Sequence, residues 1–372
     1  MTDHDQPSSI RIEGTTLLLF AFDIGFQIDL DATERLIRDA TRQRVVRSRR
    51  PAPVWFDYAP PPLQLSEDCD PIEFDGGLTH RGVELLVYDF GAALLTYRLP
   101  LPSTLDGLPG LSASLYNQRA IEADARARVQ RLIDTIRPAV ERPKLSDAVE
   151  DYVVFAITDW DAGASPQSLL DAAGPVLARA IEAENNDLAP EQMARSLEGR
   201  MSFAPGDMAI IDWNAAILFD REPEDVVAVL QHANVELLEL RMLDQELDAI
   251  LDNADETLSV LIRRRVWPGF VTGRMLRRVA SAQTDAAVMF EGVNNAIKLL
   301  GNQYLARLYR VTASRLDLPA WQKSVQRKLD ATESLYQKMS DAASSRRMET
   351  LEWVIIVLIA ASMLLPFLPW YH

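Results

Sequence analysis

The densest group of chemically capable side chains is a run of arginines and aromatic residues in the second half of the chain. Six arginines and two large aromatic residues fall within 263–278, around the helix-breaking pair Pro268-Gly269. Guanidinium groups bind phosphates, and neighbouring Trp and Phe rings insert into a lipid interface or stack on bases. The pattern predicts a contact with anionic lipid or another polyanion; a solvated basic turn with Trp267 folded into a helical bundle stays open as the alternative. The predicted contact consists of Arg263, Arg264, Arg265, Trp267, Arg274, Arg277 and Arg278.

The other reactive side chains are too dispersed to predict catalysis. The four histidines lie far apart in the sequence, and the single Cys69 excludes a multi-thiolate metal site. Asp151 lies at the opposite end of one predicted strand from Asp159 and Asp161, so these carboxylates are interpreted as solvated loop residues. The sequence contains no phosphate-binding loop, dinucleotide fingerprint, zinc-protease helix or nucleophile elbow. We expect no catalytic residues, no cofactor and no metal site, with an enzyme of unrecognised site as the alternative.

The net charge of −16 is unevenly distributed along the chain. Acidic residues dominate up to about residue 260, whereas Lys and Arg are in excess between 261 and 350. This balance argues against nucleic acid as the main partner, although it leaves a local basic patch open. The basic region is expected either to lie near anionic headgroups or to pack on the acidic part of the chain.

An internal repeat predicts how the N-terminal half folds. Strand-like, helix-like and paired strand-like runs follow one another in the order β-α-β-β twice, with the paired strands at 83–99 and 208–219. Asp89-Phe90-Gly91 and Asp212-Trp213-Asn214 interrupt the pairs, and Gly and Asn suit tight turns. We therefore interpret Asp89 and Asp212 as turn residues. The predicted fold class is α+β: a duplicated β-α-β-β (ferredoxin-like) head, its two units related by approximate two-fold symmetry.

The remainder of the chain has a helical pattern. Apolar residues at spacings of three and four predict one long helix over 224–258, and further helices up to about residue 343. These predict an antiparallel bundle, with an intermolecular coiled coil and hence a homo-oligomer as the alternative. The expected domains are 1–137 and 138–222 for the two head units, 223–349 for the helical region and 350–372 for a terminal segment.

The terminal segment is predicted to be a transmembrane tail anchor. No residue from 353 to 371 is charged, and Trp353, Trp370 and Tyr371 occupy positions expected of interfacial anchors. Arg346 and Arg347 precede the segment, so the positive-inside rule predicts a cytoplasmic N-terminal part. The expected location is the cell inner membrane, with a single pass and the lipid bilayer as a partner.

The C-terminal sequence resembles a known family. Asp317-Leu318-Pro319-Ala320-Trp321, a later Leu335-Tyr336 and the run Leu351-Glu352-Trp353 leading into Val354–Ile359 are similar to the required-for-meiotic-nuclear-division family, also called YagE-like. The resemblance covers about 205–365 and leaves the duplicated N-terminal half unmatched. It implies an integral membrane protein that acts as a scaffold or tether, with no catalytic residues to carry over.

The predicted function is therefore a membrane-anchored scaffold or tether with a cytoplasmic α/β head. An enzyme is the second reading. A CorA-like transport-related protein is the third, and it lacks the Gly-Met-Asn pore motif and a second span.

Overall fold

The protein is described by a computed structural model that covers residues 10–40, 60–116, 118–263 and 303–364, together with 280–281, 284, 286–288 and 290. It forms two compact units. Unit 1 comprises Met1–Met242 and Glu291–Gln322, and unit 2 comprises Leu243–Phe290 and Lys323–His372. The division falls inside two long helices, α6 (Glu224–Arg263) and α9 (Leu318–Leu364).

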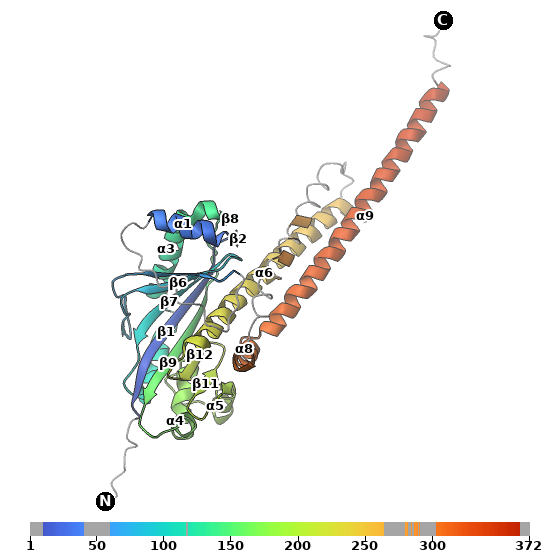
Figure 1. The fold of residues 1–372 in the computed structure, drawn as a ribbon. Coiled ribbons are helices and arrows are strands. Elements are labelled where there is room, and N and C mark those ends of the chain that lie inside the picture. Colours follow the sequence, from blue (N-terminus) through green and yellow to red (C-terminus); the bar gives the residue numbers. More distant parts are fainter. Residues whose placement is uncertain are drawn as a thin grey trace, which may run out of the picture. The chain divides into compact units, whose positions relative to one another are not determined.

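Unit 1 is built on one eight-stranded sheet with the strand order β10-β11-β12-β9-β1-β7-β6-β3 (Figure 1). Its strands are β1 (Ile12–Asp23), β3 (Leu63–Glu67), β6 (Val83–Val87), β7 (Ala92–Pro100), β9 (Glu150–Trp160), β10 (Arg200–Met201), β11 (Met208–Ile211) and β12 (Ala215–Phe219). Two short ribbons accompany it: β2 (Gln27–Ile28) with β8 (Val140–Glu141), and β4 (Glu73–Phe74) with β5 (Gly77–Leu78). Its other helices are α1 (Leu30–Ala40), α2 (Leu108–Leu115), α3 (Arg119–Ile136), α4 (Pro166–Ile181), α5 (Pro190–Ser196) and α8 (Gln303–Arg315), with 3₁₀ turns η1 (Leu105–Gly107) and η2 (Arg137–Ala139).

The central strands are apolar on both faces. In β1 the run from Leu17 to Phe22 is buried without interruption. Strands covered on both sides show such continuous apolar runs, because alternate side chains point to opposite faces and both faces need burial. The observed order explains the run: β1 pairs with β7 on one side and β9 on the other, antiparallel in both cases.

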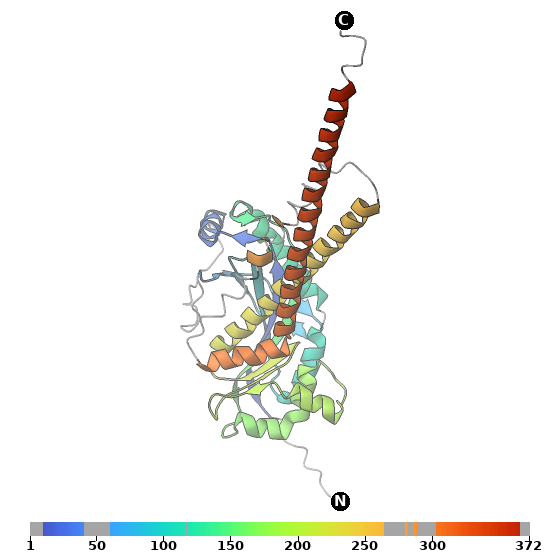
Figure 2. The ribbon, with the colours of Figure 1, turned by 90° about the vertical axis from the view of Figure 1, so that its right-hand side faces the viewer.

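Helices cover the two faces of the sheet. Leu18, Phe20 and Phe22 belong to the main core cluster, which also contains buried residues of α2, α3 and α4. The opposite face carries Leu17, Leu19 and Ala21 and meets the N-terminal part of α6, whose Gln231 bonds Thr96 of β7. Figures 1 and 2 both place α8 beside this part of α6 and near β11.

Both sequence-predicted hairpins are present, but the predicted symmetric duplication is wrong. The hairpin β6–β7 joins the sheet with β7 antiparallel to β1, whereas β12 of the hairpin β11–β12 runs parallel to β9. The cause lies in the helices that precede them. Helix α4 packs on β11 and β12 as a crossover, whereas α1 packs on α3 and η2, and β3 runs antiparallel to β1. The head is an α+β fold with one main sheet, in which most neighbouring strands are antiparallel.

A buried tyrosine fixes the β11–β12 turn, and its hydroxyl provides a test of the fold. Tyr152 of β9 is 2% exposed and donates a 2.7 Å hydrogen bond to the carbonyl of Asp212. We expect Tyr152→Phe to lower the free energy of unfolding by about 1–3 kcal/mol, because the buried carbonyl loses its donor. Urea unfolding measures the change, and Tyr116→Phe, at a position that is 57% exposed, is the matched control. Equal effects of the two variants would contradict the prediction.

Unit 2 contains the C-terminal half of α6 and most of α9. The first and third helices of an antiparallel three-helix bundle run in the same direction, and most of the predicted middle helix lies outside the described residues, so the bundle stays a prediction. Asp244 accepts a hydrogen bond from Ser324 at 2.8 Å and pairs with Lys328, which also pairs with Asp248 one turn further along α6. The contacting residues lie further towards the C-terminus in both helices at once, so α6 and α9 run in the same direction, as Figure 1 shows.

The predicted transmembrane tail anchor is also wrong. Across the parts of the chain that the structure describes, no helix combines the length and the apolar character that crossing a membrane requires. Helix α9 is continuous from Leu318 to Leu364, and its uncharged portion begins only at Trp353, after Glu352. Within the described residues, this uncharged portion comprises the 12 residues from Trp353 to Leu364, which span about 18 Å, against about 30 Å of hydrocarbon. The predicted inner-membrane location depended on this anchor and is not supported.

Candidate functional site

The structure describes few of the residues that the sequence singled out for binding. Arg263 is the last residue of α6, and Trp353 lies on α9 with 67% of its surface exposed. The rest of the predicted contact, from Arg264 to Arg278, and the predicted anchor residues Trp370 and Tyr371 lie outside the described residues. The polyanion contact therefore stays a prediction.

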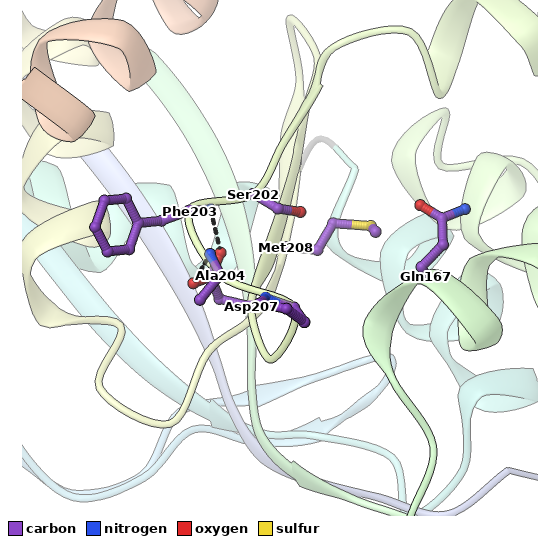
Figure 3. Close-up of a pocket in the computed structure, with 7 residues that line it drawn as sticks. Gln167, Ser202, Phe203, Ala204, Asp207 and Met208 are labelled. Atoms are coloured by element: carbon purple, nitrogen blue, oxygen red, sulfur yellow. Dashed lines mark hydrogen bonds between the residues drawn. The ribbon is translucent and has the colours of Figure 1, made fainter.

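A hollow of about 350 Å³ opens beside the short edge strand β10. Figure 3 shows its lining: Gln167 of α4 faces Met208 across the hollow, while the ring of Phe203 points away from it. The Asp207 carboxylate accepts hydrogen bonds from the backbone N–H groups of Phe203 at 2.6 Å and Ala204 at 2.9 Å. It holds the loop in place, and neither histidine, cysteine nor lysine lines the hollow.

The hollow has no reactive centre among its lining residues. Phe203 is 73% exposed and packs against Tyr304 of α8, with ring centroids 5.1 Å apart. A nucleophile needs a base within hydrogen-bond reach, and Ser202 has none among the lining residues. The geometry offers a shallow recess for an apolar or amide group, and its one carboxylate, that of Asp207, accepts the two backbone hydrogen bonds of the loop.

The most unusual chemistry in unit 1 is a polar layer buried between α6 and the sheet. On the sheet side, the amide of Asn234 donates to the carbonyl of Glu150 at 3.3 Å, and the guanidinium of Arg241 pairs with the Glu150 carboxylate. On the other side, Glu236 accepts hydrogen bonds from Tyr309 of α8 at 2.6 Å and from Gln322 of α9 at 3.0 Å. Helix α6 thus has polar contacts on two sides instead of one exposed polar face.

Burial controls the protonation of this layer. It raises the pKa of Glu150 to about 7, although the positive charge of Arg241 acts in the opposite direction. It also raises the pKa of Glu236 to about 7, against the lowering effect of the Tyr309 and Gln322 hydrogen bonds. Burial lowers the pKa of His232 to about 4, so this imidazole is neutral at pH 7. The layer therefore responds to pH near neutrality.

The layer has no arrangement suited to a metal ion. Across the described parts of the chain, His, Cys, Asp and Glu side chains nowhere gather in threes in a geometry that could hold a metal ion. Asp89 and Asp212 are held in turns, as predicted: Gly91 follows Asp89 with a φ of +106°, and the amide of Asp212 donates to the carbonyl of Ala215 at 3.0 Å.

Comparison with known proteins places the sheet in a family. The family model described as "Uncharacterized protein MJ0711, N-terminal domain" matches residues 13–225, which run from the second residue of β1 to the second residue of α6. The chain belongs to this family. A relative in Methanocaldococcus jannaschii, the uncharacterized protein MJ0711, is 19% identical over 239 residues, which is 63% of this chain and 71% of that protein. No solved structure matches the chain.

The resemblance to the YagE-like family is therefore wrong. The matched model covers the N-terminal half, which that resemblance left unexplained, and comparison indicates no YagE-like or meiotic-division family.

The polar layer was not predicted from the sequence, because the residues of this layer resemble the solvated face of a helix. Between Gln231 and Arg241, polar residues recur at the spacing of an ordinary amphipathic helix. The length of the strands was the available signal. An apolar sheet of long strands needs cover on both faces, so a helix such as α6 that packs on the sheet and carries a further helix is buried on more than one side.

Proposed function

We propose that this chain is a non-catalytic scaffold that self-associates through unit 2 and carries the MJ0711-type α/β unit as its binding module. The proposal depends on the apolar segment of α9, Trp353–Ile359. All seven of its side chains are 49–67% exposed. Single exposed apolar residues are ordinary, but a contiguous exposed run marks an interface.

The chemistry of the apolar segment favours other copies of the same chain as its partner. A helix that is apolar on all sides needs cover on all sides, so a single partner helix would leave half of it in water. Val354, Ile355, Ile356, Val357 and Ile359 are β-branched, and Ile or Val at several seam positions favours assemblies of more than two helices. A closed bundle of identical helices satisfies both requirements.

The enzymatic alternative has less support. The recess beside β10 lacks a nucleophile with a base, and the buried carboxyls of the polar layer have no route to solvent that any described cavity provides. A scaffold needs neither a nucleophile with its base nor a carboxyl group that solvent can reach.

The oligomeric state of the full chain tests the proposal. We expect the wild type to elute as an assembly of three or more copies in size-exclusion chromatography with light scattering, and Ile355→Glu/Ile359→Glu to elute as a monomer. Two charges one turn apart cannot be buried unpaired in an apolar bundle. Ala331→Glu/Ser334→Glu, at exposed positions of the same helix, adds equal charge and is expected to leave the assembly intact.

Two results would contradict the proposal. One is a monomeric wild type at micromolar concentration; the other is an assembly of unchanged mass in the Ile355→Glu/Ile359→Glu variant. Binding of the wild type to pure lipid vesicles is a further measurement. If the wild type binds vesicles and does not self-associate, lipid rather than another copy of the chain covers the apolar segment.

A further inference from the structure

The sheet of unit 1 ends in an edge strand at β10. Among the strands that the structure describes, β10 is the terminal one and pairs with β11 alone. The carbonyl of Gly199 accepts a 2.8 Å hydrogen bond from Ile211 N, and successive residues of an antiparallel strand turn their backbone groups alternately towards and away from the partner strand. The carbonyl of Arg200 therefore points away from β11. Such an edge can pair with an added strand.

The two faces of this edge carry different binding features. On the face covered by α4, Gln167 and the nearly buried Met208 line the hollow of about 350 Å³ (Figure 3). The ring of Phe203 points away from the hollow and packs against Tyr304 of α8, with ring centroids 5.1 Å apart. Side chains of an extended segment alternate between the two faces of a sheet. One side chain of an added strand would therefore enter the hollow, and the next would lie against Phe203.

The loop that follows β10 is held in the conformation that displays Phe203. The Asp207 carboxylate accepts hydrogen bonds from Phe203 N at 2.6 Å and Ala204 N at 2.9 Å. Phe203, Ala204 and Pro205 are all exposed. An aromatic ring that is already fixed in place loses little freedom on binding, so less of the interaction free energy is spent on ordering it.

Carboxylates gather beside the hollow. Asp207 and Asp220 directly flank the outermost residue pair of the β11–β12 ladder, so they lie opposite each other, and both line a second, smaller hollow next to the first. Glu222 N donates a 3.0 Å hydrogen bond to Asp220 Oδ1, and Glu224 is the first residue of α6. These side chains give this corner of unit 1 a negative charge.

The cations of the same stretches do not cancel that charge. Arg221 pairs with Asp159 at 3.9 Å, and its guanidinium carbon lies 5.9 Å from the ring centroid of Trp160. Arg200 is exposed on β10 itself. None of the residues that line the hollow is Lys or Arg. Carboxylates thus outnumber arginines at this edge, and a surface with an excess of one charge attracts a partner of the opposite charge.

We propose that the β10 edge binds an extended, basic segment of a partner protein, which adds a strand to the sheet and inserts an apolar side chain into the hollow. Backbone hydrogen bonds supply affinity in this mode of recognition, while the hollow, Phe203 and the carboxylates select the sequence. The amide of Gln167 can bond the peptide group of the inserted residue. The inference rests on the proposed function in taking unit 1 as the binding module, and it names the chemistry of the partner.

Fluorescence anisotropy with the full chain and a labelled Lys-Ile-Lys-Leu-Lys-Val peptide tests the edge. We expect Gln167→Phe to weaken binding by about tenfold or more, because the ring fills the hollow. Gln130→Phe is the matched control and is expected to bind as the wild type does. Both glutamines are exposed, and each donates a hydrogen bond to an aspartate four residues later, at 2.8 Å for Gln167 and 3.0 Å for Gln130.

The aromatic and charged parts of the edge have tests of their own. Phe203→Ala is expected to weaken binding by about tenfold, since it removes the exposed ring. A Glu-Ile-Glu-Leu-Glu-Val peptide is expected not to bind, and added salt should weaken binding of the basic peptide. Equal binding of the two peptides would overturn the proposal, as would equal affinities of Gln167→Phe and Gln130→Phe. Loss of self-association in Gln167→Phe would also overturn it, because another copy of the chain would then occupy the edge.

Peptide binding and self-association can fail separately. The Ile355→Glu/Ile359→Glu variant, which is expected to be monomeric, should bind the basic peptide with wild-type affinity. A monomeric wild type that binds the peptide would contradict self-association alone. A wild-type assembly that does not bind the peptide would contradict the β10 edge as a binding site and leave self-association intact.

Discussion

Gly91→Ala is expected to destabilise unit 1 by about 3 kcal/mol or more, a large effect for a single methyl group. Gly91 closes the turn between β6 and β7 with a φ of +106°, which side-chain-bearing residues rarely adopt. A Cβ atom there would lie 1.9 Å from the carbonyl oxygen of Gly25. The clash is with the backbone of the segment that follows β1, and a 2.9 Å hydrogen bond from Ile24 N to the Gly91 carbonyl joins the same two segments.

The contribution of the clash can be separated from that of backbone strain. Gly77, the first residue of β5, has a φ of +137°, and a Cβ added there meets nothing within 4 Å. Gly77→Ala carries strain alone and is expected to cost about 1–2 kcal/mol. Urea unfolding at a shared slope measures both variants. If Gly91→Ala costs no more than Gly77→Ala, the close approach to Gly25 has no energetic importance.

The same turn illustrates what could be predicted from local sequence. Asp89-Phe90-Gly91 lies between two strand-like runs, and Gly is the residue that a positive φ demands, so the hairpin β6–β7 was predictable. The long helices α4 and α6 were predictable for a similar reason, because their apolar spacing is regular over several turns. These elements depend on interactions between near neighbours in the chain.

The pairing of those elements was not predictable from the repeat. Similar hairpin sequences, with Asp-aromatic-Gly and Asp-aromatic-Asn turns, join the sheet in opposite directions relative to β1 and β9. The direction depends on whether the preceding helix crosses the sheet, as α4 does, or packs on α3 and η2, as α1 does. That difference depends on contacts between α1 and α3, which are distant in sequence, and no hairpin motif encodes it.

The candidate site shows the same limit. In the sequence, Glu236 and Glu239 fit the exposed polar face of an amphipathic helix. The structure buries both, because α6 packs against the sheet on one side and α8 on the other. The predicted membrane anchor is wrong because, among the described residues, no helix is long and apolar enough to cross a membrane.

The second large expected effect is a pH-dependent loss of stability in Arg241→Gln. Glu150 is 9% exposed, and Arg241 pairs with its carboxylate. Removing one partner of a buried pair leaves a buried charge, which costs several kcal/mol in a dry site. The Arg241 side chain is 44% exposed, so solvent screens the pair, and we expect a loss of about 2 kcal/mol at pH 8.

The sign of the pH dependence separates this ion pair from simple packing. The pKa of Glu150 is raised to about 7 in the folded protein, so the folded state binds more protons than the unfolded state between about pH 4.5 and 7, and stability falls as pH rises through that range. Without Arg241 the folded pKa rises further, and the fall continues above pH 7. The difference between wild type and Arg241→Gln should therefore be small at pH 5, where Glu150 takes up a proton, and largest at pH 8.

Unfolding at both pH values, together with a double-variant cycle, measures this effect. Glu150→Gln/Arg241→Gln should recover most of the stability lost in Arg241→Gln at pH 8, because no buried charge remains. Arg81→Gln removes a pair with Asp70 in which both side chains are at least 70% exposed, and it should change stability little at either pH. A pH-independent loss in Arg241→Gln would instead assign its role to packing over Trp321, whose ring centroid lies 5.9 Å from the guanidinium carbon.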